Sequence, residues 1–393
     1  MNKLSRFNSS LFVASCAMLT GTIFYQSQDA YASTLTMAKP LSFSVADQGI
    51  KVQGVISGLG FAQTSPQNAS LDGLLASKTV GTVISNAMLI LTDDTGLFGF
   101  HLLAGSYVSP GVGLPLRDNL NFGPLPVGYL IINPSKYISV DIGKMPTLIG
   151  PIYGFSYQRD NIQGGLLWAV ENAKNRGVQV NYNKGTISLS VSLNDGYYTN
   201  RYNYFDGSLS YTINAKNSIT VFGGGNLGHT GTLIDNQNFN GYSNSGYVNA
   251  SLVADNSDIY GLYYQFKNRF ITILPHVQYI YTPKSPSFGT TRSSSVIGGA
   301  IDLTFHFTHT ISLATAFDYQ SSSGPQSGLI VGYGNNSKAF AVQLTPTYSK
   351  DGYFVRAGLS FVHVSNPSSG DVFGLLGTNP NQFRALVETG YYF

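Results

Sequence analysis

Five charged side chains that could act together lie close in the sequence, between residues 145 and 176. The rest of the chain is poor in charge, since only 10% of its 393 residues are Asp, Glu, Lys or Arg. Charges of both signs held around a narrow aqueous passage select solutes by size and charge. The chemistry expected here is therefore selection during passage, and the residues that we expect at a constriction are Arg159, Asp160, Glu171, Lys174 and Arg176.

Other charges recur singly within stretches where apolar and small polar residues alternate. In a strand, alternate side chains point to opposite faces, so each such charge shares a face with Ser, Thr, Asn or Gln. We expect this face to line an aqueous interior, with wall residues Asp141, Lys144, Asp302, Asp318, Arg356, Arg384 and Glu388. The alternative, which the sequence leaves open, is that these charges and the constriction set only fix a segment to the wall.

Patterns for catalysis or cofactor binding are weak in this chain. Residues 223–228 fit G-x-G-x-x-G, but no amphipathic helix follows, so no dinucleotide site is expected. The six histidines are dispersed, no G-x-S-x-G motif occurs, and Cys16 is the only cysteine. We therefore predict no enzymatic activity, no cofactor and no metal site. A net charge of +3 without a basic run also gives no footprint for nucleic acid.

The segment that best indicates the fold is the last one, residues 383–393. Its odd-numbered residues run from Phe383 to Phe393, carry no charge and end in two aromatics, whereas the other face carries Arg384 and Glu388. A strand of about 9–11 residues with one apolar face is what a transmembrane β-barrel requires. The pattern resembles the closing strand of bacterial outer-membrane barrels, which ends in Phe, and implies that the barrel-assembly machinery engages it.

The remaining chain repeats this alternation. In stretches such as 187–193, 311–319 and 340–348 the apolar face lacks charge and the other face is polar. A charge facing lipid at the bilayer midplane costs about 2–4 kcal/mol, so this pattern favours apolar side chains outside and a wet lumen inside. Seven short turns and eight long connections predict an all-β antiparallel up-and-down barrel of about 16 strands, with 14 or 18 as alternatives. Residues 247–254 and 328–332 could be extra strands of an 18-stranded barrel, but we interpret them as parts of connections.

The first residues have the character of an export signal. Lys3 and Arg6 precede an apolar stretch, and Ala30-Tyr31-Ala32 is a small-x-small cleavage site. We expect residues 1–32 to be removed and residues 33–393 to form the barrel in the outer membrane of a Gram-negative bacterium. Val13-Ala14-Ser15-Cys16 also resembles a lipoprotein box, but the apolar run continues past Cys16, which favours ordinary cleavage.

The longest organised connection, residues 145–175, is the predicted constriction loop. It holds the only Trp and is unusually apolar for a solvated loop, and a connection of this length usually has a function. Three segments near it, residues 143–150, 176–182 and 193–203, together with 344–348 and 384–390, resemble the β-barrel porin family described as OmpL-like. The resemblance implies an outer-membrane channel.

The function expected is a water-filled channel for passive diffusion of small hydrophilic solutes or ions. Its surroundings would be outer-membrane lipid and lipopolysaccharide, and a homo-oligomer is left open. One alternative is a surface receptor or adhesin with a plugged barrel. A further alternative is a lipid-hydrolysing barrel, for which His363 beside Ser365 is the lipid-facing candidate, without an evident orienting partner in the sequence.

Overall fold

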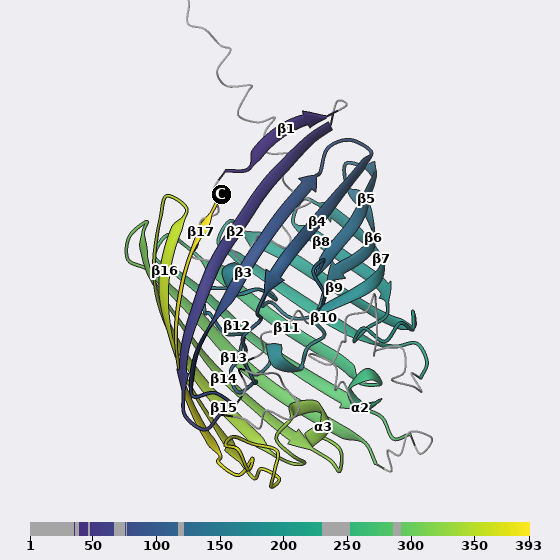
Figure 1. The fold of residues 1–393 in the computed structure, drawn as a ribbon. Coiled ribbons are helices and arrows are strands. Elements are labelled where there is room, and N and C mark those ends of the chain that lie inside the picture. Colours follow the sequence, from purple (N-terminus) through teal and green to yellow (C-terminus); the bar gives the residue numbers. More distant parts are fainter. Residues whose placement is uncertain are drawn as a thin grey trace, which may run out of the picture.

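The structure, a computed structural model, describes residues 35, 39–45, 48–66, 75, 77–116, 122–229, 252–285 and 292–393. The predicted signal peptide, residues 1–32, and Cys16 lie outside the described residues. Nearly all regular structure is β-strand (Figure 1). Among the described residues, none of the helices has the length and apolar composition that a membrane crossing requires.

Sixteen antiparallel strands form the barrel, and a short strand, β1 (Leu41–Val45), extends β2 beyond its rim (Figure 1). Each barrel strand pairs with the next along the chain. β17 returns to pair with β2, where Tyr392 lies opposite Val55 and Arg384 opposite Gln63. The barrel strands are β2 (Gln48–Gln63), β3 (Val80–Asp93), β4 (Phe98–Tyr107), β5 (Val127–Ser135), β6 (Ile138–Pro146), β7 (Lys174–Lys184), β8 (Ile187–Asn194), β9 (Tyr204–Asn214), β10 (Asn217–Asn226), β11 (Asp258–Lys267), β12 (Ile271–Thr282), β13 (Ser294–His306), β14 (Ile311–Ser323), β15 (Lys338–Lys350), β16 (Tyr353–Ser365) and β17 (Asn381–Tyr392). The predicted strand number of 16 is confirmed.

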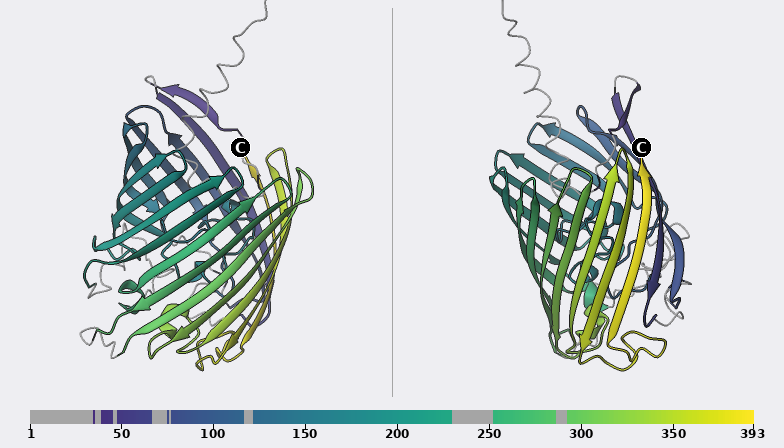
Figure 2. Two further views of the ribbon diagram at one scale, coloured as in Figure 1. Left: turned by 180° about the vertical axis from the view of Figure 1, so that it is seen from behind. Right: turned by 90° about the vertical axis from the view of Figure 1, so that its left-hand side faces the viewer.

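Short turns lie at the end of the barrel that also holds the C-terminus, and long connections lie at the other end (Figure 2). All seven predicted short turns fall between consecutive strands. Residues 328–332 belong to a connection, as expected, and contain the helix α3 (Gly328–Val331), while Leu252–Asp255 forms the helix α2. Residues 247–251 of the other segment, 247–254, lie outside the described residues.

The two faces of the strands differ as the alternation predicts. On β17 the outward residues Phe383, Val387 and Tyr391 are exposed, whereas Arg384, Glu388 and Tyr392 are buried. The same contrast holds around the barrel, where exposed Leu, Ile, Val, Phe and Tyr side chains alternate with buried polar ones. Because a barrel has no strand edges, every backbone group in its wall can find a partner inside the lipid. The exposed apolar surface is thus the surface that a bilayer would cover.

A β-bulge in β3 changes the direction of two side chains. The register between β2 and β3 shifts beyond Ser57, so that Ser85 is an extra residue and both Ser85 and Asn86 are fully buried. β-Bulges commonly redirect side chains in this way. A proline within a strand pattern predicts a bulge, but Pro275 and Pro346 make none. Pairs are missing beside both prolines, since proline has no N–H to donate, but the register is the same on either side.

The candidate constriction loop and the lumen

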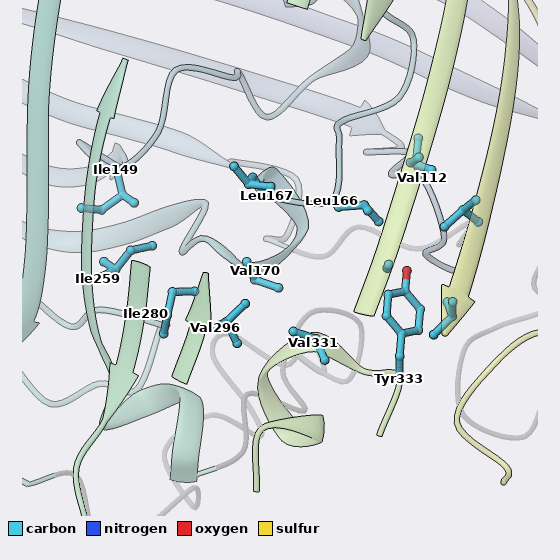
Figure 3. Packing of buried hydrophobic residues seen from close by; sticks show 14 of the residues in the cluster. Val112, Ile149, Leu166, Leu167, Val170, Ile259, Ile280, Val296, Val331 and Tyr333 are labelled. Carbon is cyan, nitrogen blue, oxygen red and sulfur yellow. The ribbon is translucent and has the colours of Figure 1, made fainter. Parts of the chain in front are cut away.

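The connection between β6 and β7, residues 147–173, folds into the lumen, and we call it the constriction loop. It contains two short 3-10 helices, η1 (Ser156–Gln158) and η2 (Trp168–Val170). Its apolar side chains Ile149, Leu166 and Leu167 are buried among inward residues of the wall such as Ile280 and Val296 (Figure 3). Burial of apolar area is the main stabilising contribution available to such a loop, which explains its apolar composition.

The constriction loop packs with other long connections. Gly164 forms a parallel bridge with Gly111 of the β4–β5 connection, and the Val112 amide donates to the Gly164 carbonyl at 2.9 Å. Val331 and Tyr333 of the β14–β15 connection join the same apolar cluster (Figure 3). The sequence predicted one inserted loop, and the lumen is in fact narrowed by several connections together.

A buried ion pair between wall strands holds the constriction loop. The Arg356 guanidinium and the Glu388 carboxylate approach to 2.6 Å, and both side chains have no exposed surface. The same guanidinium donates to the carbonyls of Ser156 (2.6 Å) and Arg159 (2.8 Å) in the loop. Glu388 accepts from the Ser156 hydroxyl at 2.8 Å. Arg356 and Glu388, predicted as wall residues, therefore lie on the inner wall and contact the loop directly.

A second anchor, Arg384, lies four residues before Glu388 on the same inner face of β17. Arg384 donates to the carbonyls of Gly111 (3.0 Å) and Leu114 (2.8 Å) and to the side-chain oxygen of Gln163 (2.9 Å). On β14, the Asp318 carboxylate accepts from the backbone N–H of Leu166 at 3.0 Å. The contacts of Arg356, Arg384, Glu388 and Asp318 agree with the alternative that the sequence left open, in which these charges attach the loop to the wall.

Arg159 and Asp160, two of the charges predicted at the constriction, have different surroundings within the loop. Arg159 is buried, with its guanidinium stacked on Trp168 at 4.9 Å and bonded to the carbonyls of Pro110 and Ile162. Asp160 is half-buried and accepts a hydrogen bond of 2.6 Å from Thr304 on β13. Arg159 thus shapes the loop, whereas Asp160 reaches the wall on the side of β13.

Glu171 and Lys174 lie at the end of the loop, deep in the packing. Burial, together with the nearby Asp318 carboxylate, raises the pKa of Glu171 well above its ordinary value. Lys174 lies with its ammonium 5.0 Å from the Phe155 ring and donates to the Ala173 carbonyl.

Lys144 and Arg176 lie elsewhere than expected. They pair across β6 and β7. Each lies two residues from an exposed residue of its own strand, Ile142 or Val178, and therefore on the same face, so the register assigns both to the outward side of the wall. Both flank the ring of Tyr198, at 5.1 and 4.0 Å, and Arg176 pairs with Asp195 at 2.6 Å. They line a groove of about 680 Å³ together with the apolar residues Leu125, Ile142, Val178 and Leu193.

Asp141 and Asp302, the remaining predicted wall residues, face inward. Asp141 is buried and accepts a hydrogen bond of 2.8 Å from Asn181. Asp302 lies 3.8 Å from the His276 ring nitrogen and is partly exposed. A cavity of about 60 Å³ remains between the loop and strands β11–β13, and its lining includes Asp160, Asp302, Lys267 and Thr304. Within the described ranges no group of three or more potential metal ligands occurs.

One feature of this site has no signal in the sequence, whereas another has one. Ser85 and Asn86 join the anchor because of the bulge in β3, where Asn86 donates to Ser156 at 2.8 Å and Ser57 contacts Ser85 at 2.8 Å. The outward placement of Lys144 and Arg176 does have a signal, because each lies two residues from an apolar outward residue.

Comparison with known proteins agrees with this architecture. Three solved structures resemble the fold: an outer membrane protein, OmpT, of Vibrio cholerae (TM-score 0.56, 10% identity, covering 91% of this chain and 100% of that one), the outer membrane channel DcaP of Acinetobacter baumannii (0.55, 11%, 89% and 99%) and an anion-selective porin from Comamonas acidovorans (0.54, 10%, 88% and 99%). No curated protein sequence matches.

A family model described as "Putative beta-barrel porin-2, OmpL-like" matches residues 49–393, which include the whole barrel wall except the first residue of β2. The expected resemblance is confirmed, and so are the porin architecture and the location in the outer membrane of a Gram-negative bacterium. The chain belongs to the family of OmpL-like β-barrel porins, and it is an outer-membrane channel for the passive diffusion of solutes.

Proposed function

We propose that small hydrophilic solutes and ions pass through the part of the lumen that the constriction loop leaves open beside β11–β13. The observation that carries this proposal is the polar cavity between Asp160 of the loop and Asp302 of the wall. Charged and hydroxyl groups on both sides of a narrow passage replace part of a solute's hydration shell. Arg159 is bonded to carbonyl groups and stacked on Trp168, so it contributes less to this passage than the two carboxylates.

The cavity lining carries two carboxylates, Asp160 and Asp302, and two cations, Arg159 and Lys267. The Arg159 guanidinium is bonded to the Pro110 and Ile162 carbonyls and stacked on Trp168, so we propose a weak preference for cations. Transport is the principal activity that we assign. The predicted roles of Glu171, Lys174 and Asp141 in selectivity stay proposals, and Lys144 and Arg176 are assigned to the outer groove.

The Asp302→Asn variant tests this assignment. We expect its reversal potential, measured in planar bilayers under a salt gradient, to shift toward anions, because one of two carboxylates at the passage is removed. Asp351→Asn is the matched control, since Asp351 is exposed in the turn between β15 and β16 at the other end of the barrel. Equal reversal potentials for Asp302→Asn and the unmodified protein would reject the proposed path.

The surroundings of the channel are part of the same proposal. Residues 1–32 direct export and are removed, the barrel-assembly machinery engages the strand that ends at Phe393, and the exposed apolar belt contacts outer-membrane lipid and lipopolysaccharide. One of the similar structures is the trimer form of OmpT from Vibrio cholerae, which supports testing the oligomeric state of this chain as well.

A further inference from the structure

A serine, a histidine and an asparagine form a hydrogen-bonded row at the long-loop ends of β16 and β17. His363 Nδ1 lies 2.8 Å from Asn381 Oδ1, and His363 Nε2 lies 3.2 Å from Ser365 Oγ. This is the order of nucleophile, base and orienting group found in hydrolases that act through a serine or cysteine. We propose that Ser365, His363 and Asn381 form an acyl-hydrolase site for ester lipids of the outer leaflet.

The two hydrogen bonds suit one tautomer of the neutral imidazole. The side-chain oxygen of Asn381 can only accept, so Nδ1 of His363 carries the proton and donates it to Asn381. Nε2 is then left with a lone pair that accepts from the Ser365 hydroxyl. A histidine in this tautomer can remove the proton of the serine as it attacks. Asn381 supplies the orienting partner that the sequence did not reveal for His363 and Ser365.

The row lies on the lipid side of the wall. His363 is opposite Asn381 on one side and opposite Phe340 on the other, and its ring lies 5.5 Å from that of Phe340. Phe340 is 42% exposed and belongs to the outward apolar face of β15. The connection between β16 and β17 also exposes Leu375 and Leu376. An acyl chain lying along the barrel would therefore have apolar contacts beside the triad.

A lysine lies beside the proposed nucleophile. Lys338 pairs directly with Ser365 across β15 and β16, so the two side chains share the outward face with their Cβ atoms about 5 Å apart. From this position the ammonium group can reach the oxyanion of a tetrahedral intermediate or the phosphate of a lipid headgroup. The site thus favours an ester lipid that carries a phosphate.

The reaction is ester hydrolysis through an acyl-enzyme. Ser365 Oγ attacks the ester carbonyl carbon, and its proton moves to Nε2 of His363. The tetrahedral oxyanion collapses, the bond to the leaving alcohol breaks, and His363 returns the proton to that alcohol. Water then attacks the acyl-Ser365 ester with His363 as base, which releases the fatty acid and restores the serine. Ester and water are converted to carboxylic acid and alcohol, and no other reactant is needed.

The test uses the full mature protein purified in a non-ionic detergent, in four versions: unmodified, Ser365→Ala, Asn381→Ala and His309→Ala. Hydrolysis of phosphatidylethanolamine in mixed micelles is followed by release of fatty acid. A fluorophosphonate probe, which reacts with activated serines, is located by peptide mass spectrometry. His309 is the matched control, because it is an exposed histidine in a turn at the opposite end of the barrel.

We expect the probe on Ser365 of the unmodified protein, and hydrolysis slower by about 10³-fold or more in Ser365→Ala. Asn381→Ala should lower both hydrolysis and probe labelling by about tenfold or more, since it removes the group that orients His363. His309→Ala should match the unmodified protein. Bilayer conductance should be equal in all four, which shows that each folds. If the unmodified protein hydrolyses lipid no faster than Ser365→Ala, and the probe leaves Ser365 unlabelled, the proposal is wrong.

Discussion

Replacing Arg356 by alanine should lower the free energy of unfolding by about 3–5 kcal/mol, because it leaves the fully buried Glu388 carboxylate without its charge partner. The same change removes the two hydrogen bonds to the Ser156 and Arg159 carbonyls, so the constriction loop should also loosen. Unfolding by guanidinium in lipid vesicles measures the first effect. Trp168, the only Trp of the chain, lies in the loop, and quenching of its fluorescence by acrylamide measures the second.

Two comparisons separate the ion pair from a general effect of losing an arginine. Arg269→Ala removes an exposed arginine that lies over the Phe270 ring at a turn, and it should change neither measurement. The double variant Arg356→Met with Glu388→Leu should recover most of the stability, because a buried pair replaced by apolar groups is often neutral. The loop should nevertheless stay loosened, since its carbonyls still lack donors. A loss below about 1 kcal/mol in Arg356→Ala would reject the anchor.

Replacing residues 147–173 by a short Gly-Ser turn should raise single-channel conductance several-fold. The replacement is feasible because Pro146 and Lys174 pair directly, so the ends of β6 and β7 are already adjacent. A closed barrel of 16 strands encloses an aqueous channel when nothing fills it, and the loop with its apolar cluster occupies that space. The measurement is the unitary current in planar bilayers.

The control replaces residues 268–270, the turn between β11 and β12, by a Gly-Ser turn at the opposite end of the barrel, and it should leave the current unchanged. Folding of both proteins is checked by heat-modifiable mobility on a gel. If the shortened protein is folded and its current equals that of the unmodified protein, the constriction loop does not limit passage.

The strands and their connections were predictable because a membrane wall repeats one simple rule. The alternation on β17 correctly assigned Phe383, Val387 and Tyr391 to the exposed face and Arg384 and Glu388 to the buried one. Short turns followed from their Asn, Asp and Gly residues. The alternation of apolar and polar residues holds along each strand as long as the register does not shift. The strands could therefore be recognised and counted.

The site was less predictable, because its contacts depend on register and on packing between distant segments. Arg356 and Glu388 meet because β16 and β17 align them in register, and their contact with Ser156 depends on how the loop packs. The bulge at Ser85 has no sequence signal comparable to proline or glycine. Lys144 and Arg176 were assigned to the lumen because of their charge. Each lies two residues from an apolar outward residue, Ile142 or Val178, and this spacing indicated the outward side.

The central claim is that apolar side chains of the wall face lipid while the polar ones enclose solvent. Ser208, Leu209 and Ser210 test it most directly, since they are consecutive in the middle of β9, with Leu209 exposed and both serines half-buried on the inner face. Each is changed to cysteine in a Cys16→Ser background, and the protein in lipid vesicles is treated with a charged, membrane-impermeant maleimide. The account predicts labelling at residues 208 and 210 and protection at 209, whereas labelling at 209 alone would contradict it.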